Sequence, residues 1–541
     1  MRIIDASARS WDAAAAGFRW NVPEYFNIAH AVCEKHTDRR NRIALYYENE
    51  RGDKATYTFG DIKRLSDRFA NALRGLHIER GDRVAIILSQ RPETAIAHMA
   101  IYKIGAIALP LSILFGSDAI EYRLRDSSAK LVITDRTHRD RVGSLIADIP
   151  ELNTVIDCDA EDAAGFWGLL DRASDRSDVA DTRADDPALL IYTSGTTGPP
   201  KGALVAHRCL YGNLTGFELS QNLFPQLDDL FWTPADWAWT GGLIDGLLPS
   251  WYYGVPIVGY EGGKFDPEFA CDLMSRYRVR NAFIPPTALK MIRQVDRIRE
   301  RYEVRLRSVM SAGETLGAEL YQWGRDVLDL EINEMWGQSE ANYLVGNCAA
   351  LMEVQPGSMG KAYPGHRVEP VDSEGQVLAD GEVGELAAYR SGDPVLFLGY
   401  WNNDAATKAK YLGEWWGTGD MGYRDERGYV WFVGRTDDVI SSAGYRIGPG
   451  EIEDCLLKHP AIAQAAVIGV PDSLRGEIVK AFIVLKTEAS PSDELKAQIQ
   501  ASVRDRLAAY EYPRAIEFID ELPLTTTGKV RRIELRDRET P

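Results

Sequence analysis

Short apolar segments alternate with helical patterns through the first third of the chain. VAIILSQ (84–90) is followed by RPETAIAHMAIYKIGA (91–106), whose apolar spacing predicts an amphipathic helix. The apolar stretch IALPL comes next, and a second helical pattern leads to LVITD (131–135) and then to NTVIDCD from residue 153. Strand, helix and strand at this spacing predict a mostly parallel sheet that is covered by helices.

From about residue 355 the pattern changes to short, turn-rich strands such as GEVGELAAY (381–389) and RGYVWFVGR (427–435). Beyond them we expect a helix at 450–458, strands in AQAAVIGV and VKAFIVL, and a helix from about 491 to 508. This compact α+β stretch predicts a separate C-terminal domain. Its boundary falls near Arg435–Asp438, where the absence of a long Pro/Gly linker predicts a short hinge.

Composition agrees with an ordinary globular protein of more than one domain. The 541 residues are 45% hydrophobic and 26% charged. A net charge of −18 argues against a general binder of nucleic acid or anionic membranes. If the protein handles phosphate, its Lys and Arg residues must therefore be concentrated locally.

Metal sites and disulfides are not indicated by the cysteine and histidine pattern. The six cysteines form no C-x-x-C pair and the eight histidines form no H-x-x-x-H pair, so buried, reduced thiols are expected. No apolar run of 18 residues occurs, which predicts no membrane span. Asp5 and Asp12 interrupt the start of the chain where a signal peptide needs apolar residues, so we expect a cytoplasmic protein.

The stretch YTSGTTGPPKG (192–202) has the residues of a phosphate-binding loop. It is not a Walker A loop, because Pro200 and Gly202 occupy the positions of the second Gly and the Ser/Thr. A surface linker is the alternative, but the β-type stretch LLIYTS leads directly into the loop and ordered sequence resumes after it. Backbone N–H groups, hydroxyl groups and Lys201 can together hold phosphate.

This stretch is similar to the phosphate loop of the AMP-forming adenylating enzymes, which include acyl-CoA synthetases, luciferases and the adenylation domains of peptide synthetases. Further stretches extend the resemblance over nearly the whole chain, in the family's order: SAGET (311–315), MWGQSEAN (335–342), GEWWGTGDMGY (413–423), AGYRIGPGE (443–451) and PLTTTGKVRR (523–532).

The resemblance implies an α/β fold with two domains. The N-terminal AMP-binding domain, residues 1–435, would contain doubly wound β-sheets with helices and a small β-barrel-like part. The C-terminal domain, residues 436–541, would be a small, mobile α+β unit with Asp437 at the hinge.

The family's chemistry has two steps. A carboxylate attacks the α-phosphate of ATP and gives an acyl-adenylate and pyrophosphate, and the thiol of CoA then displaces AMP. ATP and CoA are co-substrates and Mg²⁺ assists. Neither step needs a protein nucleophile, so the protein has to hold the reactants together and stabilise the charge that develops on phosphorus.

The resemblance assigns catalytic roles to Thr193, Glu340, Arg435 and Lys529. The implied ATP/AMP-binding residues are Thr193, Ser194, Gly195, Thr196, Thr197, Gly198, Lys201, Gly313, Glu314, Thr315, Glu334, Met335, Trp336, Gly337, Gln338, Ser339, Asp420, Phe432, Arg435, Arg446 and Lys529.

Within this set, Trp336 would lie beside the adenine and Ser339 would contact the α-phosphate. Glu340 would bind Mg²⁺. Asp420 would accept hydrogen bonds from both ribose hydroxyls, because a carboxylate offers two acceptors. Phe432 would stack on the adenine.

The implied cationic groups act on the ribose and the phosphates. Arg435 would reach the ribose, and Arg446 would approach the phosphates in the adenylating arrangement. Lys529 would bridge the carboxylate and the α-phosphate. A charge pair about 4 Å apart at an effective dielectric near 20 is worth roughly 4 kcal/mol, or about a thousandfold in rate if it forms only in the transition state.

The C-terminal sequence most resembles medium-chain acyl-CoA synthetases and their acetyl-CoA synthetase relatives. Ala443, Gly444 and Tyr445 would line the pantetheine path, with the backbone of Gly444 along the tunnel. Arg475 of SLRGE matches a CoA-contacting arginine, and Arg504 is a further candidate.

The acyl pocket is implied to include Trp237, Trp239, Gly242 and Gly337, although either indole is equally well explained as part of the core. Acetate-specific relatives carry a second Trp where this chain has Gly337, which predicts a longer acid, since each buried CH₂ contributes about 0.8 kcal/mol. A short branched or medium-chain fatty acid is expected.

Two other readings stay open. The enzyme could be an aryl-acid (benzoate-like) CoA ligase, or it could pass the acyl group to a carrier protein. The chain ends at Pro541, twelve residues after Lys529, so no fused carrier is expected. The resemblance also suggests a lysine acetyltransferase and deacetylase acting on Lys529, whose acetylation would remove its charge.

Overall fold

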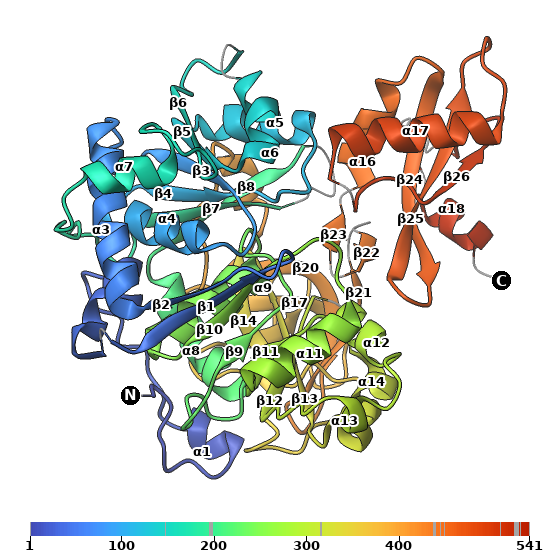
Figure 1. The fold of residues 1–541 in the computed structure, drawn as a ribbon. Helices are drawn as coiled ribbons and strands as arrows, with labels where there is room; N and C mark the ends of the chain where they lie inside the picture. The colour runs from blue at the N-terminus through green and yellow to red at the C-terminus, as the bar shows by residue number, and fades with distance from the viewer. Residues whose placement is uncertain are drawn as a thin grey trace.

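The computed structural model has a large N-terminal domain of sheets and helices and a small C-terminal domain beside it (Figure 1). This confirms the predicted mixed α/β class. The structure describes residues 2–39, 41–145, 148–193, 199–313, 316–435, 440–443, 445–447, 449–508, 510–523, 530 and 532–539.

A seven-stranded sheet carries the predicted strand–helix–strand pattern. Its order is β18 (Gly399–Tyr400), β8 (Lys201–Ala206), β7 (Pro187–Thr193), β4 (Ile107–Pro110), β3 (Arg83–Ile87), β5 (Leu131–Thr134) and β6 (Thr154–Asp157). Strands β7, β4, β3, β5 and β6 are parallel, as predicted, whereas β7 and β8 form an antiparallel hairpin. The associated helices are α3 (Phe59–Gly75), α4 (Pro92–Lys103), α5 (Ser117–Ser127), α6 (Arg136–Gly143) and α7 (Phe166–Arg172).

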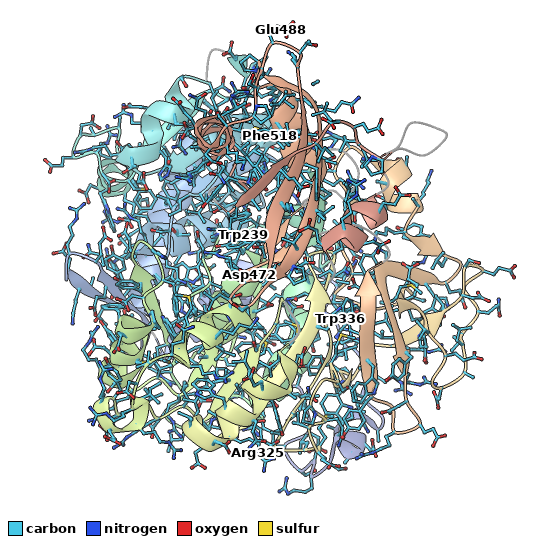
Figure 2. All side chains as sticks on the ribbon, turned by 90° about the vertical axis from the view of Figure 1, so that its right-hand side faces the viewer. Trp239, Arg325, Trp336, Asp472, Glu488 and Phe518 are labelled. Carbon is cyan, nitrogen blue, oxygen red and sulfur yellow. The ribbon has the colours of Figure 1, made fainter. Side chains whose placement is uncertain are left out.

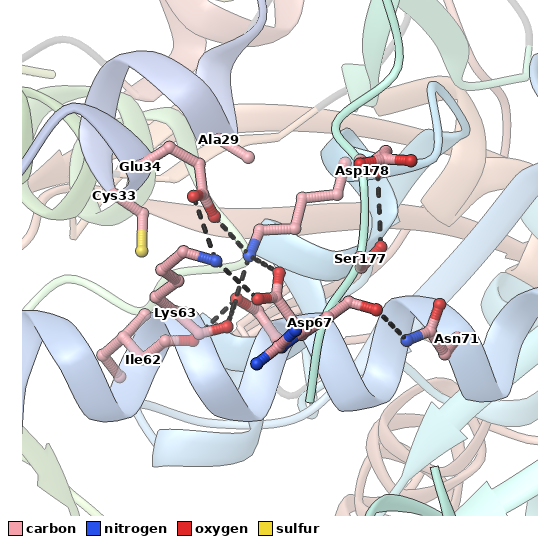
Figure 3. Close-up of polar contacts among 12 residues, drawn as sticks. Ala29, Cys33, Glu34, Ile62, Lys63, Asp67, Asn71, Ser177 and Asp178 are labelled. Carbon is pink, nitrogen blue, oxygen red and sulfur yellow. Dashed lines mark hydrogen bonds and ion pairs between the residues drawn. The ribbon is translucent and has the colours of Figure 1, made fainter. Parts of the chain in front are cut away.

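The helix predicted at 91–106 is confirmed as α4, but its predicted amphipathic character was wrong, because every residue of α4 is buried. Lys103 is fully buried, and its Nζ lies 2.5 Å from Asp67 Oδ1 and 2.7 Å from Glu34 Oε1. Figure 3 shows Glu34, Lys63 and Asp67 pointing toward one another in this cluster. Two carboxylates from distant segments thus compensate the buried lysine, and a polar position becomes part of the interior.

A nine-stranded sheet forms the second layer of the large domain. Its order is β15 (Lys361–Ala362), β14 (Ala341–Gly346), β13 (Ile332–Gln338), β12 (Ser308–Ser311), β11 (Asn281–Phe283), β9 (Phe231–Trp232), β10 (Ile257–Glu261), β1 (Ile43–Asn49) and β2 (Lys54–Thr58). The associated helices are α8 (Cys209–Ser220), α9 (Thr240–Gly242), η3 (Leu243–Leu247), α10 (Leu248–Tyr252), α11 (Pro267–Tyr277), α12 (Pro286–Ile292), α13 (Ile298–Arg301), α14 (Gly317–Trp323) and η4 (Gly324–Leu328).

The region predicted to hold turn-rich strands forms a five-stranded antiparallel sheet. Its strands are β16 (Val368–Val371), β17 (Gly384–Tyr389), β20 (Trp415–Arg424), β19 (Tyr411–Leu412) and β21 (Val430–Arg435), with β21 paired to β20. Four short helices complete the large domain: α1 (Trp11–Ala15), α2 (Ile28–Val32), η1 (Glu34–Arg39) and α15 (Asp404–Lys408).

The C-terminal domain follows the sequence prediction closely. Its strands are β22 (Ile440–Ser442), β23 (Tyr445–Ile447), β24 (Ile462–Asp472), β25 (Gly476–Leu485) and β26 (Ala515–Phe518); its helices are α16 (Pro449–Leu457), α17 (Asp493–Arg506) and α18 (Arg532–Glu539). In Figure 1, β22 and β23 face the large domain, whereas α18 lies on the outer side. The two domains share one apolar cluster that includes Phe115 of the large domain and Leu507 of the small one.

All six cysteines are buried and free, which confirms the predicted burial of the thiols. Burial raises the pKa of Cys33, beside the Lys103 cluster, to about 12. Within the described part of the chain, no helix is long and apolar enough to cross a membrane.

Candidate active site

The ends of the phosphate-loop candidate are fixed by the β7–β8 hairpin. Thr193, the last residue of β7, pairs in register with Lys201, the first residue of β8. The Thr193 hydroxyl donates to the carbonyl oxygen of Lys201 at 3.4 Å. The two residues that flank the loop are therefore held by paired strands. Five of its predicted phosphate-binding residues lie outside the described residues: Ser194, Gly195, Thr196, Thr197 and Gly198.

Tyr400 connects this hairpin to Glu340. The Lys201 ammonium lies 5.4 Å from the centroid of the Tyr400 ring, and the Tyr400 hydroxyl donates to Glu340 Oε1 at 2.7 Å. Sequence reasoning missed Tyr400, because β18 has only two residues and gives no pattern of its own. Lys201 and Glu340 thus both lie against Tyr400. Lys201 is the cation predicted for the β- and γ-phosphates, and Glu340 is the carboxylate predicted for Mg²⁺.

The donor set fits a magnesium ion that is held mainly by substrate. Glu340 is 8% exposed, and its carboxylate offers hard oxygen ligands. Among the described residues, no group of three or more His, Cys, Asp or Glu side chains could cage a metal. Because Mg²⁺ is usually bound by one or two carboxylates together with phosphates and waters, a single carboxylate is sufficient.

Asp420 organises the predicted adenosine site. Its carboxylate is fully buried, and Oδ2 accepts hydrogen bonds from Trp336 Nε1 at 3.1 Å and from Gln338 Nε2 at 2.9 Å. Asp420 also pairs with Arg435 across the β20–β21 ladder, in which Gly422 pairs with Phe432. Residues from two separate sequence motifs are thereby brought together. The Arg435 side chain lies outside the described residues.

Ser339 connects the nucleotide motif to the predicted acyl pocket. Its hydroxyl lies 3.2 Å from the hydroxyl of Thr240, which directly follows Trp239. At Gly337, a Cβ atom would lie 2.7 Å from the backbone nitrogen of Tyr343. The structure therefore gives no support to the idea that the missing indole leaves open space at Gly337.

Glu334 marks the inner edge of the nucleotide motif. Its carboxylate accepts a hydrogen bond from the backbone N–H of Leu316 at 3.2 Å. Burial raises the pKa of Glu334 to about 7, and the Leu316 hydrogen bond opposes that shift. Met335, the next residue, is also buried. Gly313, three residues before Leu316, has a φ of 96°. Glu314 and Thr315 lie outside the described residues.

The two predicted pocket tryptophans lie in different environments. Trp237 is fully buried in the main core, and its Nε1 has no hydrogen-bond partner in the part of the chain that the structure describes. Trp239 contacts the C-terminal domain, with its ring centroid 5.8 Å from that of Tyr445. Gly242 has no room for a Cβ atom, which would meet the carbonyl oxygen of Asp236. Trp237 thus belongs to the core and Trp239 to the domain interface.

The β22–β23 hairpin brings part of the predicted CoA site to this interface. Tyr445 stacks on Tyr510 with ring centroids 3.8 Å apart and an angle of 6°. Ala443 has a φ of 54°, which is uncommon for a residue with a side chain, and its N–H donates to the carbonyl oxygen of Arg475 at 2.9 Å. In Figure 2, Trp239 and Trp336 lie toward the middle of the molecule, where β24 ends at Asp472.

Arginines gather on the C-terminal domain around Tyr512. The guanidinium carbons of Arg504 and Arg514 lie 4.4 and 5.0 Å from the centroid of its ring. Burial lowers the pKa of Arg514, and the neighbouring charges of Arg475 and then Arg504 lower it further. Both predicted CoA-binding arginines therefore act on the charge of Arg514. Arg514 was missed because nothing in its local sequence marks it.

Several predicted residues lie outside the described part of the molecule. Gly444, Asp437 and Lys529 are among them, as is the side chain of Arg446. On the C-terminal side of Lys529, Val530 packs against the apolar cluster that contains Leu522 and Leu535. Arg532 forms two hydrogen bonds of 2.9 and 2.7 Å with the Glu453 carboxylate. The first turn of α18 is thus tied to α16 within the C-terminal domain.

Comparison with protein families agrees with this geometry. Residues 32–401 match the AMP-binding enzyme family, and residues 451–529 match the AMP-binding enzyme C-terminal domain. The acetyl-coenzyme A synthetase of Bacillus subtilis (strain 168) is 37% identical over 521 residues, covering 94% of this chain and 90% of that protein. The mitochondrial acyl-coenzyme A synthetase ACSM3 of Rattus norvegicus is 35% identical over 555 residues, covering 99% of this chain and 94% of that protein.

Solved structures give the same picture. ATP-bound MatB from Rhodopseudomonas palustris is 28% identical with a TM-score of 0.70, covering 95% of this chain and 98% of that one. A double mutant of o-succinylbenzoate CoA synthetase (MenE) from Bacillus subtilis, bound with its product analogue OSB-NCoA, is 26% identical with a TM-score of 0.81 and the same coverage. The chain therefore belongs to the AMP-binding enzyme family and, within it, resembles acyl-CoA synthetases.

Proposed function

We propose that the protein is an ATP-dependent acid:CoA ligase of the AMP-forming type. It activates a carboxylic acid as an acyl-adenylate with release of pyrophosphate and then forms acyl-CoA. The observation that carries this proposal is the buried Asp420 carboxylate, held by Trp336 and Gln338 close in sequence to Ser339 and Glu340. A buried carboxylate beside an indole suits a ribose diol and an adenine ring.

The large domain supplies the groups that hold ATP. Asp420 accepts from the ribose hydroxyls, Trp336 borders the adenine and the Ser339 hydroxyl contacts the α-phosphate. Thr193 and Lys201 hold the outer phosphates from the paired ends of the β7–β8 hairpin. Glu340, oriented by Tyr400, contributes a carboxylate oxygen to Mg²⁺, which neutralises phosphate charge when bound.

Lys529 supplies the catalytic charge on the α-phosphate, and Arg435 and Arg446 assist on the ribose and the phosphates. Their positions match the family's motifs in the sequence. In the first step the acid's oxygen bonds to the α-phosphorus, the bond from that phosphorus to the β-phosphate oxygen breaks, and pyrophosphate leaves. A cation placed there stabilises the charge of the transition state.

The domain arrangement supports use of CoA in the second step. The β22–β23 hairpin, not α18, faces the large domain, and Tyr445 lies against Trp239. The chain also matches a CoA-synthetase structure that holds a CoA product analogue, with a TM-score of 0.81. Arg475, Arg504 and Arg514 supply positive charge for the phosphates of CoA.

The proposal includes domains at residues 1–435 and 436–541 with a hinge at Asp437, and a short branched or medium-chain fatty acid as substrate. An aryl acid is the alternative acid and a carrier protein the alternative acceptor. A panel of acids with CoA as the only acceptor, scored by AMP and pyrophosphate release, separates these readings. The cytoplasmic location and an acetyltransferase acting on Lys529 stay predictions.

Substitution of Lys529 tests the assigned mechanism. We expect Lys529→Ala to lose carboxylate-dependent pyrophosphate exchange by about a thousandfold, while supplied acyl-AMP and CoA still give thioester. The reason is that the lysine acts on the α-phosphate only in the first step. Arg531→Ala removes one neighbouring charge and serves as the control. Equal loss of both half-reactions in Lys529→Ala would contradict the assigned role.

A further inference from the structure

Gly116 lies at the contact between the two domains. It caps α5, and its backbone is extended, with φ −73° and ψ 173°, so any residue can adopt its conformation. A Cβ atom at this position would lie 2.6 Å from the backbone nitrogen of Leu507 and still closer to the carbonyl group of Arg506. Both of these residues lie at the C-terminal end of α17. The domains can therefore approach as they do only because residue 116 has no side chain.

Neither side of this contact can move away easily. Arg141 of α6 donates to the carbonyl oxygen of Phe115 at 2.8 Å, and the guanidinium of Arg123 lies 4.1 Å from the Phe115 ring centroid. On the other side, Leu507 is 4% exposed and its N–H donates to the carbonyl oxygen of Val503 at 2.8 Å. A side chain at position 116 would therefore be accommodated mainly by displacing the whole C-terminal domain.

The same contact fixes four aromatic rings around the predicted CoA path. Phe115 and Trp239 come from the large domain, and Tyr445 and Tyr510 come from the C-terminal domain. The Trp239 ring centroid lies 5.8 Å from those of Phe115 and Tyr445 and 5.9 Å from that of Tyr510. Offset and edge-to-face packing of this kind is sensitive to small displacements. Moving α17 would move Tyr510 and, through their stacking, Tyr445.

An ion pair between α5 and the residue after α16 also joins the two domains. Lys458 Nζ, just beyond α16, lies 2.9 Å from Asp118 Oδ2 in the first turn of α5. Both side chains are partly exposed, so the pair itself contributes little stability. It nevertheless identifies two accessible positions that come together only when the domains are arranged as in Figure 1.

We infer that Gly116 is a positioning residue for the CoA-dependent half-reaction, because its missing side chain lets the C-terminal domain dock with Tyr445 against Trp239. This inference rests on the proposed function. In that half-reaction the CoA sulfur bonds to the acyl carbon, the bond from that carbon to the AMP oxygen breaks, AMP leaves with the electron pair, and the thiol proton is released. The β22–β23 hairpin faces the large domain here, whereas α18, which begins three residues after Lys529, lies on the outer side. We therefore expect the adenylating half-reaction, to which we assign Lys529, to need a different arrangement of the domains.

The test compares Gly116→Ala and Gly116→Ser with Gly143→Ala. Serine keeps a good N-cap for α5, so a loss in both Gly116 variants is not a capping effect. Gly143 ends α6 in the same domain, and a Cβ atom there meets nothing within 4 Å. We expect both Gly116 variants to slow conversion of supplied acyl-AMP and CoA at least tenfold, with pyrophosphate exchange within twofold of the starting protein. Gly143→Ala should change neither rate.

A chemical cross-link measures the arrangement directly. Cysteines at positions 118 and 458, made by Asp118→Cys and Lys458→Cys, should react with a short bis-maleimide, since all six native cysteines are buried. Adding Gly116→Ala or Gly116→Ser should lower the cross-linked fraction at least threefold, whereas adding Gly143→Ala should not.

Unchanged rates in both half-reactions, equal loss in both, or an unchanged cross-linked fraction would each overturn the role of Gly116. These results are distinct from failure of the proposed function. That failure would appear as absence of carboxylate-dependent pyrophosphate exchange in the unsubstituted protein across the acid panel. The cross-linking result still decides in that case whether Gly116 controls docking.

Discussion

The nucleotide side and the CoA side of the candidate site are built in opposite ways. On the nucleotide side, Asp420, Trp336 and Gln338 all belong to the large domain and are joined by hydrogen bonds around a buried carboxylate. On the CoA side, Trp239 and Tyr445 come from different domains and meet through ring packing. The first is preorganised before any substrate arrives, whereas the second exists only when the domains dock.

This difference indicates which substitutions should affect both half-reactions and which should affect only one. Removing a hydrogen bond on the nucleotide side leaves a buried polar group without its partner and weakens every step that uses the nucleotide. Disturbing the CoA side shifts a domain equilibrium and can spare the first half-reaction. Substitutions on each side should therefore give different patterns of loss. The predictions for Asp420 and Arg514 test that contrast, and the prediction for Glu334 tests the burial of the nucleotide side.

The largest effect is expected at Asp420. Asp420→Ala removes both acceptors for the ribose hydroxyls, and hydrogen bonds to charged groups contribute about 1.5–3 kcal/mol each. We expect pyrophosphate exchange to fall at least about a hundredfold, and thioester formation from acyl-AMP to fall as well, because the adenylate carries the same ribose. Asp420→Asn keeps one acceptor, so its rates should lie between those of Asp420→Ala and those of the unsubstituted protein. If Asp420→Ala slowed only one half-reaction, the proposed contrast between the nucleotide side and the CoA side would be wrong.

The second prediction concerns the stability of the protein rather than its rate, and follows from the protonation of Glu334. Burial raises its pKa in the folded protein to about 7 from an ordinary 4.5. Between these values the folded state holds a proton that the unfolded state has released. The stabilising contribution is thus present below pH 4.5 and is lost as pH rises through 7, by about 3 kcal/mol in total.

Glu334→Gln removes this titration. The melting temperature of the variant relative to the unsubstituted protein should therefore rise between pH 5 and pH 8. Glu319→Gln is the control, because that carboxylate is exposed. A constant difference between Glu334→Gln and the unsubstituted protein at the two pH values would contradict a buried, proton-binding Glu334.

The smallest effect is expected at Arg514. Arg514→Met keeps packing against Tyr512 and removes one of the clustered charges. A partly screened charge contact contributes about 1 kcal/mol, so the KM for CoA should rise about fivefold while pyrophosphate exchange stays unchanged. Arg280→Met is a control far along the chain from this cluster. A fivefold fall in pyrophosphate exchange in Arg514→Met would instead show that Arg514 acts on the nucleotide side.

Local patterns predicted much of the fold because periodicity and turn residues act over short distances. The predicted helix at 450–458 is α16, and the predicted strands AQAAVIGV and VKAFIVL lie within β24 and β25. The helix at 91–106 was predicted correctly, but its expected polar face is buried, because the burial of Lys103 depends on Asp67 and Glu34 from segments far away in the chain. No window around Lys103 contains that information.

The sequence by itself determined the family, the parallel α/β pattern and the motifs that carry Trp336, Glu340 and Asp420, because these depend on residue types at short, fixed spacings. Only the tertiary structure decided that Tyr400 orients Glu340, that Trp237 is core while Trp239 faces the other domain, and that Gly116 touches α17. The physical reason is sequence distance. A hydrogen bond, a ring contact or the absence of a Cβ atom acquires its meaning from a partner that folding brings close.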